Sequence, residues 1–130
     1  MSTPVSSAVF GAGSWGTALA VHLAHSGHRV QLWGRDRELV ERMRRDRVNA
    51  TYLPGVELPA LIEPTHAFAT AGDARFAIFA VPSHGLRAVA ASAAPHLRET
   101  AIVISATKGI EEGRLCRMTE VLGEELGGRP

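Results

Sequence analysis

Three glycines in the chain have a spacing that suits phosphate binding. Gly11, Gly13 and Gly16 form the pattern G-x-G-x-x-G, directly after the apolar run of residues 5–10. In a strand-turn-helix unit the first glycine permits the tight turn, the second admits a phosphate close to the backbone, and the third lets helix and strand pack closely. The unpaired N–H groups and the dipole of the helix N-terminus then attract an anion. We expect this turn to hold the pyrophosphate of NAD(P); a purely structural glycine turn is the alternative.

A second signal stands where the next apolar run ends. Arg35 follows residues 29–33, roughly 20 positions after Gly13, where dinucleotide-binding proteins contact the ribose. A guanidinium there can bind a 2′-phosphate through paired hydrogen bonds or stack on the adenine, so NADP is favoured over NAD. Two alternatives stay open. Arg35 could simply begin a solvated helix, or Asp36 could turn inward and serve the ribose of NAD.

Two further groups follow apolar runs that predict buried strands. Pro82 and Ser83 come directly after residues 76–81, and Lys108 comes shortly after residues 101–105. Residues at the carboxyl ends of parallel strands face the ligand crevice of an open sheet. Lys108 is the only lysine in the chain, and its ammonium group suits a phosphate or a carbonyl oxygen. The alternative for Lys108 is an exposed charge on a loop.

Other reactive side chains are given no site. His22, His25 and His28 are close in sequence but have no acidic or cysteine ligand nearby, so we interpret them as surface histidines. Cys116 stands beside an apolar residue in a predicted helix and is interpreted as a packing residue. We therefore predict no metal site, and no spacing supports a Ser-His-Asp arrangement.

The elements that must position these groups alternate between strand and helix patterns. Short apolar runs predict strands over residues 5–10, 29–33, 61–65, 76–81 and 101–105. Helical patterns cover residues 14–26, 36–46, 83–94 and 114–126. Asp36 and Ser83 are the expected N-caps, Leu115 lies on the inner face of the last helix, and a loop surrounds Pro54. The alternation predicts an α/β fold: a doubly wound, Rossmann-type, mostly parallel sheet in the strand order 3-2-1-4-5, with helices on both faces.

Length and composition limit the remaining possibilities. The 130 residues suffice for one domain, 1–130, and the net charge of +1 gives no reason to expect nucleic acid. The single cysteine excludes an internal disulfide and fits a reducing compartment. No apolar run is long enough to span a bilayer, and the N-terminus lacks the pattern of a signal peptide. We expect a cytoplasmic protein without membrane insertion.

Four blocks of the sequence, in order, resemble bacterial NAD(P)-dependent glycerol-3-phosphate dehydrogenases. They are residues 11–20, 49–55 with Leu58 and Pro59, 81–87 and 107–111. The resemblance covers nearly the whole chain and implies the N-terminal, cofactor-binding domain of such an enzyme. It further implies that the catalytic lysine belongs to a helical second domain after residue 130. No catalytic residue is then expected in this chain, and we expect no turnover from it alone.

The resemblance also implies roles for single residues. Ser14 and Trp15 would contact the diphosphate of the cofactor, Arg35 its adenosine side, and Tyr52 would lie near it. Pro82 and Ser83 would line the nicotinamide half. Lys108 would touch both the cofactor and the substrate.

The implied reaction interconverts dihydroxyacetone phosphate and sn-glycerol 3-phosphate with NAD(P)H, which feeds glycerophospholipid synthesis. The full-length protein could form a homodimer. Two alternatives are a stand-alone NADP-binding or sensing module without catalysis, and a dehydrogenase of the same architecture that acts on another small acid.

Overall fold

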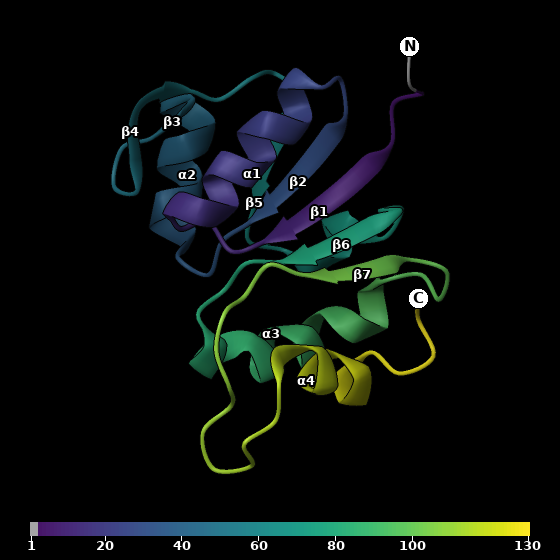
Figure 1. Ribbon diagram of the computed structural model, residues 1–130. Coiled ribbons are helices and arrows are strands. Elements are labelled where there is room, and N and C mark those ends of the chain that lie inside the picture. The colour runs from purple at the N-terminus through teal and green to yellow at the C-terminus, as the bar shows by residue number, and fades with distance from the viewer. Residues whose placement is uncertain (1–2) are drawn as a thin grey trace.

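The computed structural model describes residues 3–130, which are built around a five-stranded parallel sheet (Figure 1). The strands are β1 (Ser6–Phe10), β2 (Arg29–Trp33), β5 (Ile62–Thr65), β6 (Phe76–Phe79) and β7 (Ile102–Ser105). Their order across the sheet is β5-β2-β1-β6-β7, and all neighbouring pairs are parallel. This arrangement confirms the predicted 3-2-1-4-5 order. In the centre, Val9 of β1 stands between Leu32 of β2 and Ile78 of β6.

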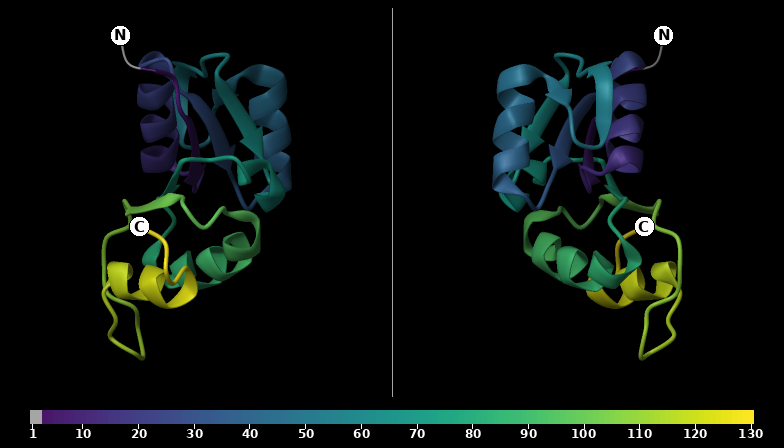
Figure 2. Two further views of the ribbon diagram at one scale, coloured as in Figure 1. Left: turned by 90° about the vertical axis from the view of Figure 1, so that its right-hand side faces the viewer. Right: turned by 90° about the vertical axis from the view of Figure 1, so that its left-hand side faces the viewer.

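Helices cover both faces of the sheet, as predicted for a doubly wound fold. α1 (Ser14–His25) and α2 (Arg37–Asp46) lie on one face, and α3 (Leu86–Ala93) and α4 (Met118–Glu125) on the other (Figures 1 and 2). Alternate strand residues enter two apolar clusters: Val9 packs with the first helix pair, whereas Phe10 and Phe79 pack with the second. Because both faces are covered, the central strands are continuous apolar runs.

A small antiparallel hairpin occupies the segment that was predicted to be a loop. It consists of β3 (Val48–Asn49) and β4 (Leu53–Glu57), and it lies beside α1 and α2. Pro54 and Gly55 are turn-forming residues, and β3 has only two residues, so the local pattern indicates no strand. The hairpin forms because Arg47, in a left-handed conformation, ends α2 and accepts a 2.7 Å hydrogen bond from Leu58 N–H.

The last helix begins later than predicted, and the expectation for Leu115 was wrong. Instead of starting at residue 114, α4 starts at Met118, and Leu115 is 76% exposed with a φ of 57°. The preceding segment folds back on itself, because Glu111 N–H donates to the Cys116 carbonyl at 2.8 Å and Leu115 N–H donates to the Glu111 carbonyl at 2.9 Å. The residues between β7 and α4 therefore form a long loop, which begins near Lys108.

The remaining boundaries differ little from the expectations. Asp36 caps α2 as predicted, with its Oδ1 accepting from Glu38 N–H at 2.9 Å. Ser83 caps no helix: residues Ser83–Gly85 form a short 3-10 turn, η2, and α3 follows from Leu86. Two further short turns are η1 (Phe68–Ala71) and η3 (Ala94–His96). Within residues 3–130 no helix has the length and apolar character needed to cross a membrane.

Candidate functional site

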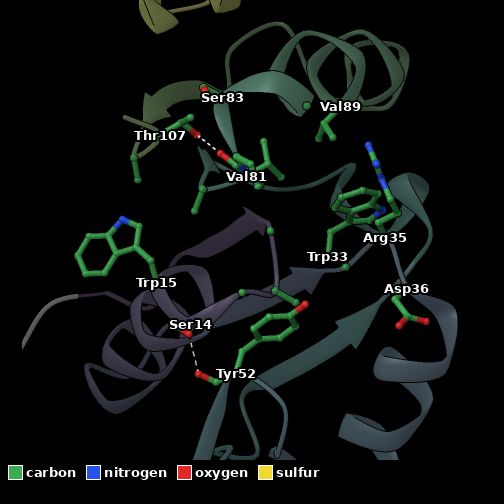
Figure 3. Close-up of a pocket in the computed structure, with 18 of the residues that line it drawn as sticks. Ser14, Trp15, Trp33, Arg35, Asp36, Tyr52, Val81, Ser83, Val89 and Thr107 are labelled. Carbon is green, nitrogen blue, oxygen red and sulfur yellow. Dashed lines mark hydrogen bonds between the residues drawn. The ribbon is translucent and has the colours of Figure 1, made fainter. Parts of the chain in front are cut away.

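A cleft of about 850 Å³ lies at the carboxyl ends of the central strands (Figure 3). The loops after β1, β2, β6 and β7 form most of its walls, and the turn of the β3–β4 hairpin adds one side chain. This is where doubly wound sheets hold ligands, because the chain leaves β1 and β6 toward opposite faces of the sheet. All predicted site residues except Gly16 line the cleft: Gly11, Gly13, Ser14, Trp15, Arg35, Tyr52, Pro82, Ser83 and Lys108.

The glycine turn forms the floor of the cleft and needs its glycines for steric reasons. Gly11 has a φ of 126°, and a Cβ there would stand 2.6 Å from the Ala80 carbonyl oxygen. A Cβ at Gly16 would overlap the Gly11 carbonyl oxygen. Gly16 thus lies beneath the turn, where it allows α1 to approach β1, and does not itself line the cleft.

The N-terminus of α1 opens into the cleft at Gly13. This residue is the N-cap, and no side-chain hydrogen bond caps the helix. A Cβ at Gly13 would meet no atom within 4 Å, so the space in front of it is open. The first intrahelical hydrogen bond runs from Thr17 N–H to the Gly13 carbonyl at 3.0 Å, and the N–H groups before it lack helical partners. Together with the helix dipole, and with no acidic residue in the first turn, they form an anion site.

Arg35 and Asp36 adopt different roles at the end of β2. Figure 3 shows the Arg35 side chain extending past Trp33 toward Val89. Its Nη2 atom would lie 3.8 Å from a Cβ at Gly85, and no hydrogen bond or ion pair within residues 3–130 engages its guanidinium. The Asp36 carboxylate, in contrast, is held by the backbone of α2 at Glu38. The exposed cation therefore faces the cleft, while the carboxylate next to it caps the helix.

The hairpin contacts the glycine turn through hydrogen bonds that the sequence did not reveal. Ser14 Oγ donates to the Tyr52 carbonyl at 2.7 Å, and Tyr52 N–H donates to Asn49 Oδ1 at 3.2 Å. Asn49 Nδ2 donates to both the Ala12 carbonyl and Thr17 Oγ1 at 2.9 Å. Asn49 belongs to one of the four sequence blocks, but its burial depends on the hairpin, which no local pattern predicts. The Tyr52 ring stands beside the cleft (Figure 3).

The opposite wall brings Lys108 to the rim of the cleft. Thr107 Oγ1 lies 2.8 Å from the Val81 carbonyl and 3.1 Å from the Phe79 carbonyl, which joins the loop after β7 to the end of β6 (Figure 3). Gly109 has a φ of 122°, and a Cβ there would come within 3.2 Å of the Ser83 side chain. Lys108 follows Thr107 directly, and its exposed side chain lies at the edge of the cleft.

An ion-pair network behind this wall ties the Lys108 loop to α3 and α4. The Arg87 guanidinium contacts Glu111 at 2.6 and 2.8 Å, Glu124 at 2.7 Å and Glu125 at 2.7 Å. Its hydrogen bonds to Glu111, Glu124 and Glu125 raise the pKa of Arg87 further above its ordinary value. The Arg87 hydrogen bonds also lower the pKa values of the Glu111 and Glu124 carboxyl groups. Through Arg87, these ion pairs connect the loop that carries Lys108 to α3 and α4.

Side chains without a predicted role lie mostly away from the cleft. His22 and His25 are exposed on the last turn of α1, and Cys116 packs partly buried against the α3–α4 cluster. His84 is exposed on η2 at the rim of the cleft. In the described part of the chain no group of three His, Cys, Asp or Glu side chains could hold a metal ion.

Known proteins match this chain in sequence and in fold. The sequence profile described as "NAD-dependent glycerol-3-phosphate dehydrogenase N-terminus" matches residues 6–130. The chain is 50% identical over 129 residues to glycerol-3-phosphate dehydrogenase [NAD(P)+] 2 of Salinibacter ruber, covering 98% of this chain and 37% of that protein. It is 48% identical over 125 residues to glycerol-3-phosphate dehydrogenase [NAD(P)+] of Streptomyces coelicolor, covering 95% of this chain and 37% of that protein.

A solved structure shows the same arrangement of elements. The crystal structure of glycerol-3-phosphate dehydrogenase from Coxiella burnetii matches with a TM-score of 0.90 and 31% identity, over 97% of this chain and 39% of that one. The chain thus spans well under half the length of the proteins it matches, and it corresponds to the part that the profile describes as the N-terminus. The chain belongs to the NAD-dependent glycerol-3-phosphate dehydrogenase family.

Proposed function

We propose that residues 1–130 form the NAD(P)-binding domain of an enzyme that interconverts dihydroxyacetone phosphate and sn-glycerol 3-phosphate, and so feeds glycerophospholipid synthesis. The observation that carries this proposal is the cleft itself, which joins the open N-terminus of α1 at Gly13 to a cationic rim at Lys108. The similarity to glycerol-3-phosphate dehydrogenases favours it over a sensing module without catalysis and over a dehydrogenase for another small acid.

The lining residues suit the parts of a dinucleotide. The pyrophosphate would bind at the uncapped turn of Gly13, with Ser14 and Trp15 beside it. The adenosine end would extend toward Arg35, and the nicotinamide end toward Pro82 and Ser83 at the end of β6. Tyr52 would stand beside the cofactor from the hairpin side (Figure 3).

Arg35 favours NADP over NAD in this proposal. Its guanidinium has no partner among residues 3–130 and can bind a 2′-phosphate with two N–H groups. The residue that could accept the ribose hydroxyls of NAD, Asp36, has its carboxylate engaged by α2. The similar proteins from Salinibacter ruber and Streptomyces coelicolor are both named with [NAD(P)+], which stands for NAD and NADP.

In the reaction, the cofactor would supply or accept the hydride, and the protein would bind and orient both reactants. Lys108 would hold the phosphate or the carbonyl oxygen of the substrate through its ammonium group. We assign no catalytic residue to this chain and place the general acid in the part of the full-length protein that residues 1–130 do not include. We expect no turnover from the 130-residue chain alone.

The same proposal predicts the partners, the location and the oligomeric state of the full-length protein. Its partners would be dihydroxyacetone phosphate and glycerol 3-phosphate, in the cytoplasm, without nucleic acid or membrane insertion. We further propose a homodimer of the full-length protein, which light scattering on that protein would test.

The test is a titration of the 130-residue chain with NADPH and with NADH, followed by cofactor fluorescence at low and at moderate salt. NADPH is expected to bind more tightly, to weaken with salt because its phosphates are bound by charge, and to lose its advantage in Arg35→Ala. Equal binding of both cofactors would remove Arg35 as a 2′-phosphate ligand. Binding of neither would contradict the proposed function of the cleft.

A further inference from the structure

Asn49 joins three segments that meet behind the cleft. The residue is completely buried and ends β3. Its Nδ2 donates to the Ala12 carbonyl in the glycine turn and to Thr17 Oγ1 in the first turns of α1, each at 2.9 Å. Its Oδ1 accepts from Tyr52 N–H at 3.2 Å. Both N–H donors of the amide and its carbonyl oxygen are therefore used inside the protein.

The bond to Ala12 fixes the direction of the next N–H group. In a trans peptide the C=O and the following N–H point in opposite directions, and no peptide bond among the described residues is cis. Asn49 does not line the cleft, so it draws the Ala12 carbonyl away from the cleft. The N–H of Gly13 consequently points toward the cleft, and it has no acceptor among residues 3–130.

The glycine turn needs this hydrogen bond because the backbone of a glycine rotates easily. Gly13 has no side chain that would hold the Ala12–Gly13 peptide in one orientation, and a Cβ at this position would meet open space. A turned peptide would present the Ala12 carbonyl to the cleft, where its negative oxygen would repel a phosphate. The buried amide of Asn49 prevents this rotation.

A second contact holds the same turn from the outside. Ser14 Oγ donates to the Tyr52 carbonyl at 2.7 Å, and Tyr52 is itself bound to Asn49 through its N–H. Asn49 at the end of β3 and Tyr52 in the turn that follows are thus bonded to Ala12 and Ser14, on either side of Gly13. The hairpin acts as a support for the glycine turn.

We propose that Asn49 is the positioning residue that keeps the glycine turn in its phosphate-binding conformation, with the N–H of Gly13 facing the cleft. The proposal rests on the proposed function, because it takes the pyrophosphate of a dinucleotide as the ligand of this turn. Asn49 acts on the Gly13 N–H through Ala12, since its own side chain is fully enclosed and does not line the cleft.

The test compares two variants of Asn49 with a neighbouring control. Asn49→Asp keeps the size of the side chain and the acceptor for Tyr52 N–H, and Thr17 can donate to it, but it places a carboxylate oxygen against the Ala12 carbonyl. Asn49→Ala removes all three hydrogen bonds. The control is Thr51→Ala, an exposed residue of the same turn. Thermal unfolding without ligand establishes that each variant is folded.

The probes are ADP-ribose, which carries the diphosphate, and adenosine, which carries no phosphate, each titrated into the 130-residue chain by ¹H–¹⁵N NMR. Both Asn49 variants should bind ADP-ribose at least about tenfold more weakly, because a buried hydrogen bond of the turn is lost. Adenosine binding should change by less than about twofold, and the Gly13 amide should shift less on adding ADP-ribose. Thr51→Ala should bind both probes like the unsubstituted chain.

Two results would overturn the role of Asn49. One is unchanged ADP-ribose binding by folded Asn49→Asp. The other is an equal loss for ADP-ribose and adenosine, which would indicate a general disturbance of the cleft. If the unsubstituted chain failed to bind ADP-ribose, the proposed function itself would be contradicted, and the positioning role with it.

Discussion

The Arg87 guanidinium binds both carboxylate oxygens of Glu111, at 2.6 and 2.8 Å. The two residues lie far apart in sequence, on α3 and on the loop that carries Lys108. Because the guanidinium is planar and its donors form a rigid fork, this paired contact fixes the direction of the loop as well as its distance from α3. The position of Lys108 at the cleft thus depends on a contact on the far side of the loop.

Replacing Arg87 should release the Lys108 loop. Lys108 is the only lysine of the chain, so a lysine-specific protease reports the opening of this loop at a single bond. Arg87→Met should be cleaved about tenfold faster than the unsubstituted chain, since charge-assisted hydrogen bonds to three carboxylates are lost. Arg45→Met, which breaks an exposed ion pair on α2 and adds no lysine, is the control, and equal cleavage of all three proteins would refute the anchor.

The same network predicts that acid weakens the protein. The pKa values of Glu111 and Glu124 lie below their ordinary value of 4.5 in the folded state, mainly because of the Arg87 hydrogen bonds. A lowered folded-state pKa contributes stability above the unfolded-state pKa, and this contribution is lost as the pH falls through the folded-state value. Denaturant unfolding from about pH 7 down to about pH 3 should therefore show a steeper fall for the unsubstituted chain than for Arg87→Met. Parallel curves would show that the network contributes nothing to acid sensitivity.

Gly16 offers a steric test of the glycine turn. A Cβ at this position would overlap the Gly11 carbonyl oxygen, so Gly16→Ala must displace either the turn or α1. The free energy of unfolding should fall by at least about 2 kcal/mol, within the range for overpacked interiors. Gly123→Ala is the matched control: this glycine lies inside α4 with no atom within 4 Å of a Cβ, and alanine there should stabilise by about 0.5–1 kcal/mol. Equal effects of the two substitutions would contradict the close packing at Gly16.

Local patterns predicted the parts of the fold that form from neighbouring residues. The unit β1–α1–β2 and the cap at Asp36 follow from spacing and residue type alone, and the strand order follows from the handedness of crossovers. The glycine turn and the groups after each strand therefore line one cleft.

The missed features depend on contacts between distant segments. The β3–β4 hairpin carries turn residues such as Pro54, and it is held by α2 and by the glycine turn. The start of α4 was misplaced because Leu115 has the character of a helix residue, yet Gly113 and a backbone pair between Glu111 and Cys116 fold the segment outward. The spacing of apolar residues, from which a helix is predicted, gives no sign that the chain reverses its direction in this segment.

Thr107 provides the last test, because it joins the Lys108 loop to the end of β6. Its hydroxyl lies 2.8 Å from the Val81 carbonyl and 3.1 Å from the Phe79 carbonyl. Thr107→Val keeps the shape but removes the donor, and should lower the free energy of unfolding by about 1–3 kcal/mol. It should also speed lysine-specific cleavage at Lys108 and weaken NADPH binding, because the loop moves away from the cleft. Thr119→Val, exposed on α4, should stay within about 0.5 kcal/mol. Stability and cleavage of Thr107→Val that match those of Thr119→Val would show that the hydroxyl does not hold the loop.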